Sequence, residues 1–489
     1  MRSALPAVCC VALVVLAGCS GLPVGDSGAD DPATTDGSTA TAPATTAATG
    51  GSTTDAATST TSTGTPTTET TTGTQEDRIG WENGYAHDDP IDVTPEDGFD
   101  DEEFAALKAR TMARVEVIRD REFRGEVTIE FVTREELLAD DPFSFRENPH
   151  RDLFWEAAFA VGEDRQSAAA LNDLYEVVVD GYAGADRVVI VAENPETPRI
   201  DPTVLSHELA HVLGGPRMSV DFGSATADDR LVVRSVAEGN ANFVESEYDR
   251  RCDEDWSCID RPPGAGEVED IEGVNEALFL WFAAPYTVGE TLFGDRYEAD
   301  GIAGVDGIYR TVPASMEQVI HPEAYPQDEP AEVTVPDRSA DDWERFGNPT
   351  TRIETEEFGE AILYATLKAN GVLGGPDPDI NKAQRTGLNY SHPATEGWEA
   401  DSFVAYRNGT ARGYVFASEW ESAADAEAFR DAYLDLLDSK GATRVSEGVY
   451  RIPDGPFADA FRVTVEGDRV VVVNAPTVEA LDDVHPNEE

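Results

Sequence analysis

The chain has 489 residues, enough for two or three domains with a buried core. Its 96 acidic residues outnumber 36 basic ones, which gives a net charge of −60, and only four of the basic residues are lysines. The sequence holds no basic patch that could bind nucleic acid, which excludes that class of partner. Its frequent, regular aliphatic segments exclude a wholly disordered acidic chain.

The N-terminus is typical of an export signal. Arg2 precedes an apolar run, residues 4–17, that is shorter than a membrane-spanning helix needs. The run ends in Leu-Ala-Gly-Cys19, which resembles a lipobox; the resemblance implies that Cys19 is lipid-modified and becomes the mature N-terminus. Ordinary signal cleavage with an incidental cysteine is the alternative. We expect residues 1–19 to be a signal peptide, and the mature protein to be lipid-anchored on the extracellular face of the cell membrane.

Residues 20–77 are rich in Thr, Ser, Ala, Gly and Asp and contain almost no large apolar side chain. Such a composition cannot bury a core, so it predicts a disordered stalk, with or without O-linked sugars. The stalk would hold the folded region away from the membrane.

The folded region begins near residue 78 with helices and strands in alternation. Apolar spacing distinguishes the two kinds of element. The predicted order is helix 101–121, strand 126–132, helix 168–179, a turn at 181–185 and strand 187–192.

The strongest functional signal is residues 201–214, D-P-T-V-L-S-H-E-L-A-H-V-L-G, whose Asp-Pro start and glycine end delimit a helix. His207 and His211 are four residues apart, so they lie on one face of that helix. This spacing lets both imidazoles bind one metal ion, and Glu208 can reach a water on that ion. An amphipathic helix that happens to carry two histidines is the alternative.

A second helix is predicted over residues 235–248, and it contains E-G-N-A, beginning at Glu238. HExxH followed by E-G-x-A resembles the gluzincins, in which two histidines and a glutamate from a later helix hold zinc. The resemblance implies that Glu238 is the third ligand and that the small residue after it allows close helix packing. It also implies that Asn242 orients a histidine, where many gluzincins have aspartate. Glu245 and Glu247 are the competing candidates for the third ligand.

Two features follow the second helix. Cys252 and Cys258, in a segment expected to lie outside the cell, are best interpreted as a local disulfide, with a two-cysteine metal site as the weaker alternative. Residues 274–284 predict a strongly apolar helix that should end in a turn at Pro285.

Residues 312–325 read V-P-A-S-M-E-Q-V-I-H-P-E-A-Y. The segment is similar to one found after the HExxH helix in haloarchaeal and bacterial surface peptidases. His321 is therefore a candidate donor to the transition-state oxyanion, although a structural histidine fits equally well. Tyr286 and Tyr325 are weaker candidates.

The C-terminal part predicts a small module of strands and one helix. Asn408-Gly409 is typical of a hairpin turn. A helix predicted at 355–369 precedes the module. The module's own predicted elements are paired strands at 402–406 and 413–417, a helix at 424–437, and strands at 449–450, 460–465 and 470–473. This part of the sequence carries no nucleophile, phosphate loop or metal cluster, which suits a structural or substrate-recruiting role. Asn389 and Asn408 fit the N-glycosylation pattern, although Asn408 also suits the turn alone.

We therefore expect an α+β protein with a mostly helical, zincin-like domain at 78–390, an αβ sandwich module at 391–475 and an acidic tail at 476–489. The acidic, lysine-poor composition resembles that of haloarchaeal proteins, in which strong salt screens repulsion between carboxylates. Together these resemblances imply a monomeric, lipid-anchored zinc metallopeptidase in which Glu208 is the general base for hydrolysis of a peptide or protein substrate. The alternative is a non-catalytic surface or envelope binding protein that retains a zincin fold.

Overall fold

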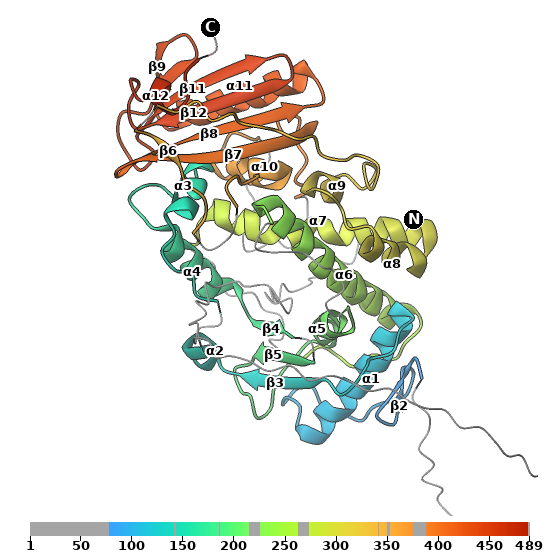
Figure 1. Ribbon diagram of the computed structural model, residues 1–489. Helices are drawn as coiled ribbons and strands as arrows, with labels where there is room; N and C mark the ends of the chain where they lie inside the picture. The colour runs from blue at the N-terminus through green and yellow to red at the C-terminus, as the bar shows by residue number, and fades with distance from the viewer. Residues whose placement is uncertain are drawn as a thin grey trace, which may run out of the picture. The chain divides into compact units, whose positions relative to one another are not determined.

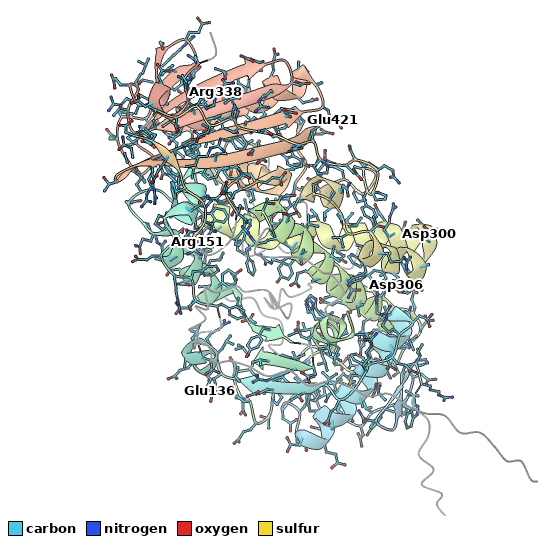
Figure 2. All side chains as sticks on the ribbon, viewed as in Figure 1. Glu136, Arg151, Asp300, Asp306, Arg338 and Glu421 are labelled. Carbon is cyan, nitrogen blue, oxygen red and sulfur yellow. A yellow bond between two sulfur atoms is a disulfide. The ribbon has the colours of Figure 1, made fainter. Side chains whose placement is uncertain are left out.

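The computed structural model describes residues 78–140, 143–184, 186–214, 225–262, 273–340, 342–349, 353–374 and 388–487. The expected signal peptide, Cys19 and the stalk lie outside these residues. Within the described ranges, no helix combines the length and the apolar character that crossing a membrane requires. Charged side chains such as Glu136, Asp300 and Glu421 are exposed at the outside of the fold (Figure 2).

Helices dominate the chain before residue 344 (Figure 1). The elements are β1 (Trp81–Glu82), β2 (Tyr85–Ala86), α1 (Asp101–Arg119), β3 (Thr128–Val132), α2 (Arg134–Asp140), α3 (Pro149–Ala157), α4 (Ser167–Val178), β4 (Gly181–Ala183), β5 (Arg187–Val191), α5 (Pro202–Gly214), α6 (Ala227–Glu254), α7 (Glu276–Asp300), α8 (Ile302–Arg310) and α9 (Met316–Ile320).

A three-stranded sheet leads into helix α5. Its order is β3-β5-β4, with β3 and β5 parallel and β4 antiparallel to β5. The expected turn after residue 180 is wrong in part, because Gly181–Ala183 is a strand paired with Val188–Ile190. The central strand β5 has three consecutive buried residues, Val188, Val189 and Ile190. This pattern is typical of a strand covered on both faces.

The expected end of the apolar helix at Pro285 is also wrong. Helix α7 continues through Pro285 to Asp300. A proline cannot donate to the carbonyl four residues earlier, so it normally ends a helix. Here Leu278, Phe282 and Phe293, on both sides of the proline, are almost completely buried. Burial of large apolar side chains contributes about 1.5–3 kcal/mol each, which offsets the local cost of the proline.

The C-terminal region is a seven-stranded antiparallel sheet of order β6-β7-β8-β12-β11-β10-β9. Helix α11 packs on one face, and α12, with Leu481 and Val484, packs on the other. The expected hairpin is confirmed, since Asn408 pairs with Ala411 around Gly409. The elements are β6 (Glu344–Arg345), α10 (Gly359–Ala369), β7 (Trp398–Asn408), β8 (Ala411–Trp420), α11 (Ala423–Ser439), β9 (Thr443–Ser446), β10 (Val449–Arg451), β11 (Ala460–Glu466), β12 (Arg469–Ala475) and α12 (Leu481–Val484).

The order of elements confirms the α+β class: a helical N-terminal region precedes a sheet region with its own helices.

Aromatic rings from both regions pack against one another. Phe154 of α3 lies 4.6 Å from Phe358 and 5.6 Å from Phe403 of β7, measured between ring centroids, and Phe358 stacks on Phe416 of β8 at 5.2 Å. Because such pairs add about 0.5–1.5 kcal/mol each beyond area burial, the sheet region shares its core with the helices.

Helices α6 and α7 pack closely where two glycines meet. A Cβ atom at Gly239 would lie 2.5 Å from the carbonyl carbon of Gly289, and one at Gly289 would lie 2.5 Å from the carbonyl oxygen of Ser235. Neither position therefore accepts a side chain without separation of the helices. The close packing predicted for the residue after Glu238 is confirmed.

We expect Gly239→Ala to lower the free energy of unfolding by about 1–3 kcal/mol, because the added methyl group overpacks the α6–α7 contact. Thermal unfolding in concentrated KCl measures the change. Gly294→Ala is the matched control on α7, since a Cβ there meets no atom within 4 Å. It should be neutral, or stabilising by up to about 1 kcal/mol. Equal effects of the two substitutions would contradict a special role for this contact.

Candidate metal centre

Helix α5 begins as its sequence predicts. The Asp201 carboxylate accepts hydrogen bonds from the backbone N–H and the hydroxyl of Thr203, at 2.9 and 3.0 Å, and Pro202 is the first helical residue. The apolar side chains of Leu205 and Leu209 are fully buried. Their burial fixes the rotation of the helix and places His207 and His211 on the side that faces α6.

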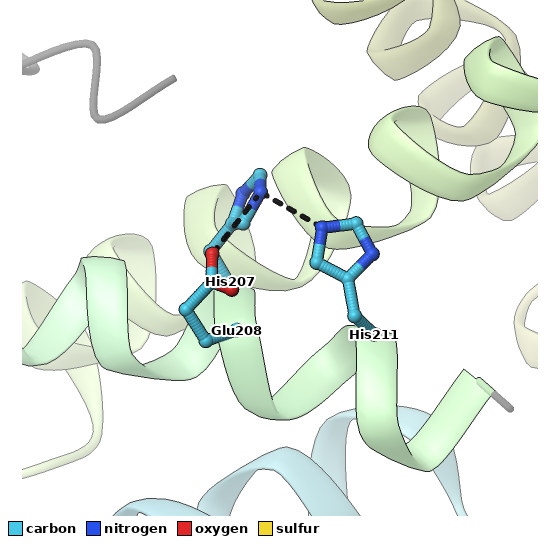
Figure 3. A group of neighbouring side chains, drawn as sticks. All are labelled: His207, Glu208 and His211. Carbon is cyan, nitrogen blue, oxygen red and sulfur yellow. Dashed lines mark hydrogen bonds and ion pairs between the residues drawn. The ribbon is translucent and has the colours of Figure 1, made fainter. Parts of the chain in front are cut away.

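Two imidazoles and one carboxylate meet between α5 and α6. The Nε2 atoms of His207 and His211 lie 3.2 Å apart (Figure 3). An oxygen of Glu238, Oε2, lies 3.5 Å from the first of these nitrogens and 3.3 Å from the second. All three side chains are at most 5% exposed. The structure therefore brings together the three residues expected to bind a metal ion.

The spacing of these three atoms fits zinc. Ligands at about 2.0–2.2 Å from a tetrahedral zinc ion lie about 3.3–3.6 Å from one another. The three observed separations are 3.2, 3.3 and 3.5 Å. Moreover, Glu238 Oε2 is buried and lies within ion-pair distance of both imidazoles, although it makes no aligned hydrogen bond among the described residues. A buried carboxylate needs a compensating positive charge, and a metal ion would supply it.

Glu208 lies beside this group of atoms. Its side chain is completely buried, and one carboxylate oxygen lies 3.7 Å from Nε2 of His207 (Figure 3). Neither carboxylate oxygen has a hydrogen-bond partner in the described part of the chain. Possible ligand atoms of His207, Glu208 and His211 all lie within 4.8 Å of one another. A base that is held beside the metal ligands but not engaged by the protein remains free to accept a proton.

The second ring nitrogen of His207, Nδ1, lies beside the carboxylate of Glu245, with 3.3 Å between Nδ1 and Oε2. The sequence had offered Glu245 only as a competing candidate for the third metal ligand. A carboxylate at this nitrogen fixes the imidazole tautomer and raises the basicity of the ligand nitrogen. Asn242, the residue expected to orient a histidine, donates its amide to the carbonyl of Tyr286 at 2.8 Å.

Burial and charge shift the pKa values of the whole group. Burial lowers the pKa of His207, but Glu238 and Glu245 raise it by more, to about 9. Burial raises the pKa of Glu208 to about 7, against the opposing effect of the two histidines. For Glu238, burial raises the pKa, but His211 and His207 lower it by more, to about 2. In the metal-free protein, His207 therefore carries a proton at neutral pH.

Arg234 is a residue that sequence reasoning missed. It lies one turn before Glu238 on α6, with its guanidinium 4.7 Å from the centre of the Phe282 ring. Burial lowers the pKa of Arg234, but Tyr175, Tyr286 and Glu238 raise it by more, so it stays charged. This buried positive charge partly offsets the carboxylates around the two histidines.

The other candidates lie elsewhere or have other partners. Nε2 of His321 lies 3.0 Å from the carboxylate of Glu360, and the hydroxyl of Tyr325 donates to the carbonyl of Thr311 at 2.6 Å. Among the described residues these contacts do not include the histidines of α5, so a role of His321 at an oxyanion stays a prediction. Glu247 pairs with Arg250 at 2.9 Å.

Cys252 and Cys258 form the expected disulfide, with their Cα atoms 5.4 Å apart.

Of the two predicted glycosylation sites, Asn389 is exposed. The amide nitrogen of Asn408 donates to Asp342 at 2.8 Å in the hairpin. Glycosylation of either residue stays a prediction.

The sheet region matches a known family. Residues 344–485 match a domain of unknown function, DUF8575. This range runs from the first residue of β6 to just past α12, so it covers the whole seven-stranded sheet. It begins before residue 391, the expected start of the C-terminal module. Comparisons with curated proteins and with solved structures find no significant match. The metal centre lies outside the matched range.

Zinc binding should release protons and should tighten as the pH rises towards about 9. The reason is that the pKa of His207 is raised to about 9, whereas a metal ligand must be the neutral imidazole. Isothermal titration calorimetry at pH 7, in buffers of different ionisation enthalpy, counts the protons released. An affinity that does not change between pH 6 and 9 would contradict protonation of His207.

Glu245→Gln should weaken zinc binding by about 10–100-fold, because the amide cannot match the carboxylate at Nδ1 of His207. Competition with a chromophoric chelator measures the affinity. Glu247→Gln is the matched control, since this glutamate lies on the same helix and pairs with Arg250 instead. If both variants bound zinc equally well, Glu245 would have no role in orienting His207.

Proposed function

We propose that the chain is a zinc-dependent peptidase in which His207, His211 and Glu238 hold the metal ion. The observation that carries the proposal is the triangle of ligand atoms, with sides of 3.2, 3.3 and 3.5 Å, which agrees with tetrahedral zinc. Burial of all three side chains adds support, because a charged group is rarely buried without a compensating partner.

The helical region, in this proposal, is a zincin-like fold of the gluzincin type. The three-stranded sheet β3-β5-β4, followed by α5 with H-E-L-A-H and α6 with E-G-N-A, agrees with that type. We further propose that the protein is exported and anchored by a lipid at Cys19, with a stalk between anchor and enzyme. The lipobox-like sequence before Cys19 and the Thr-rich segment after it support this location.

When bound, zinc would lower the pKa of a water molecule and polarise the carbonyl of a peptide bond. Glu208 would accept the proton from the attacking water, since its carboxylate is buried beside the ligands without a hydrogen-bond partner among the described residues. Burial raises the pKa of this carboxylate to about 7 in the metal-free protein. Once it has accepted the proton from water, the carboxyl group could donate that proton to the leaving amine. Glu245 would hold the ring of His207 in place throughout.

Glu208→Gln should reduce peptide hydrolysis by about 10²–10⁴-fold while one zinc ion per chain is retained, because glutamine keeps the shape but cannot accept the proton. Digestion of a peptide library in concentrated KCl measures activity, and elemental analysis measures zinc. Glu176→Gln is the control, as this glutamate is exposed on α4.

The same assay separates the enzyme from the alternative, a zinc-binding surface protein without catalysis. Retained hydrolysis in Glu208→Gln would contradict the mechanism. A wild-type protein that holds zinc but cleaves no peptide in the library would favour the binding protein.

A further inference from the structure

A basic cavity lies in this acidic protein, between the start of α3, the segment after β6 and the β7–β8 hairpin. Its volume is about 590 Å³, within the usual range of ligand pockets. Its lining includes three arginines, one histidine and no acidic residue, although acidic residues outnumber basic ones by 96 to 36 in the chain. We call it the arginine cavity, after Arg345, Arg407 and Arg412. It contains none of the residues of the proposed zinc centre.

Two of these arginines are neighbours across the β7–β8 hairpin. Arg407 of β7 and Arg412 of β8 are directly opposite each other in the antiparallel register. Side chains in such a pair project from the same face of the sheet, with Cβ atoms about 4.5–5.5 Å apart, and like charges there are destabilising. The hairpin therefore holds two positive charges together at a cost in stability, which a bound anion would offset.

Among the described residues, only the first of these two arginines has an ion-pair partner. Arg407 pairs with Glu344 at 2.7 Å, and its guanidinium lies 5.6 Å from the centre of the Phe346 ring. Arg412 is half-buried, and within the described part of the chain its guanidinium has no hydrogen-bond or ion-pair partner. A half-buried charge of this kind is available to a ligand.

The acidic groups nearest to Arg412 leave its charge uncompensated. Arg412 also borders a second cavity, which Glu156, Glu163 and Asp164 help to line, but none of these carboxylates forms an ion pair with it. Burial and the neighbouring Asp459 raise the pKa of Glu156 to about 9, and Arg412 opposes this effect only in part. The carboxyl group of Glu156 is therefore neutral at pH 7.

The other polar residues of the arginine cavity add no net charge. Arg345 donates from Nε to the hydroxyl of Tyr406 at 3.2 Å and lies 3.8 Å from a carboxylate oxygen of Asp337. Burial and the nearby Arg230 lower the pKa of His150 to about 4, so its imidazole is neutral at pH 7. The uncompensated charge in this lining is that of Arg412.

We propose that the arginine cavity binds an organic monocarboxylate, with its carboxylate on Arg412 and Arg407 and its apolar part against Phe346. A guanidinium matches a planar carboxylate with two parallel hydrogen bonds. A single uncompensated positive charge suits a carboxylate better than a phosphate group, which carries about −1.5 to −2 at pH 7. Pro149, Phe346 and Pro349 give the cavity an apolar wall, which a simple inorganic anion would leave uncovered.

Two sources can supply such a group, a free carboxylic acid or the C-terminus of a peptide. Saturation-transfer NMR of the full-length protein in concentrated KCl tests them with phenylacetate and with N-acetylphenylalanine, each compared with its neutral amide. We expect each amide to bind at least about tenfold more weakly than its acid, because the amide lacks the charge-assisted hydrogen bonds. The acid that binds more tightly identifies the source.

Three results of this comparison would overturn the proposal. The first is that neither acid binds, and the second is that acid and amide bind equally well. The third is that phenyl phosphate binds more tightly than phenylacetate, because the cavity would then prefer a dianion.

Two variants locate the site. Arg412→Gln should weaken binding of the preferred acid by about 10–100-fold, because it removes the uncompensated charge. Arg407→Gln, at an exposed position where folding is not at risk, should weaken binding by up to about fivefold, since Glu344 already shares this guanidinium. Arg444→Gln is the matched control, because it makes the same change of charge at an exposed position on β9, at the opposite edge of the sheet from β6. Unchanged binding in Arg412→Gln would overturn the proposal, since the acid would then be bound elsewhere, for example at the proposed zinc centre.

Discussion

Helices α5 and α6 bury carboxylates whose oxygens the protein does not fully hydrogen-bond. This buried charge is the constraint on which the site between them depends. Glu208 and Glu238 are both buried with oxygens that lack a hydrogen-bond partner among the described residues, yet they lie beside two imidazoles. Isolated buried carboxylates are among the most costly groups in a protein interior. The proposed function would account for their retention here, and a divalent ion is the simplest compensation.

Packing by small residues holds this costly arrangement in place. Gly239 follows Glu238 directly and contacts Gly289, so the ligand is carried on the part of α6 that lies closest to α7. Helix α7 in turn contributes to the core shared with the sheet region, through residues such as Phe282. The geometry of the ligand atoms is therefore determined by contacts between helices, not by a mobile loop.

The features that depend only on residues close together in the chain could be predicted from the sequence. The four-residue spacing of His207 and His211 predicts their convergence on a helix, and the Asp-Pro start and the hairpin at Asn408 were recognisable for similar reasons. The place of Glu245 at Nδ1 of His207 was not predicted, because the choice between Glu238 and Glu245 depends on the rotation of α6 against α5, which only tertiary packing decides. The two residues are seven apart and so share one face of the helix. The continuation of α7 through Pro285 and the short strand β6, which pairs with β7, depend on distant partners in the same way.

Helix α6 spans 28 residues, and near its C-terminal end Cys252 forms a disulfide with Cys258. Glu238, the proposed metal ligand, lies 14 residues before Cys252, which is about 21 Å along a helix axis. Fraying of a helix is confined to its last turns, so reduction of this cross-link would loosen the distal end and leave the ligands in position. The α5–α6 centre is in this sense insulated from the redox state of its surroundings.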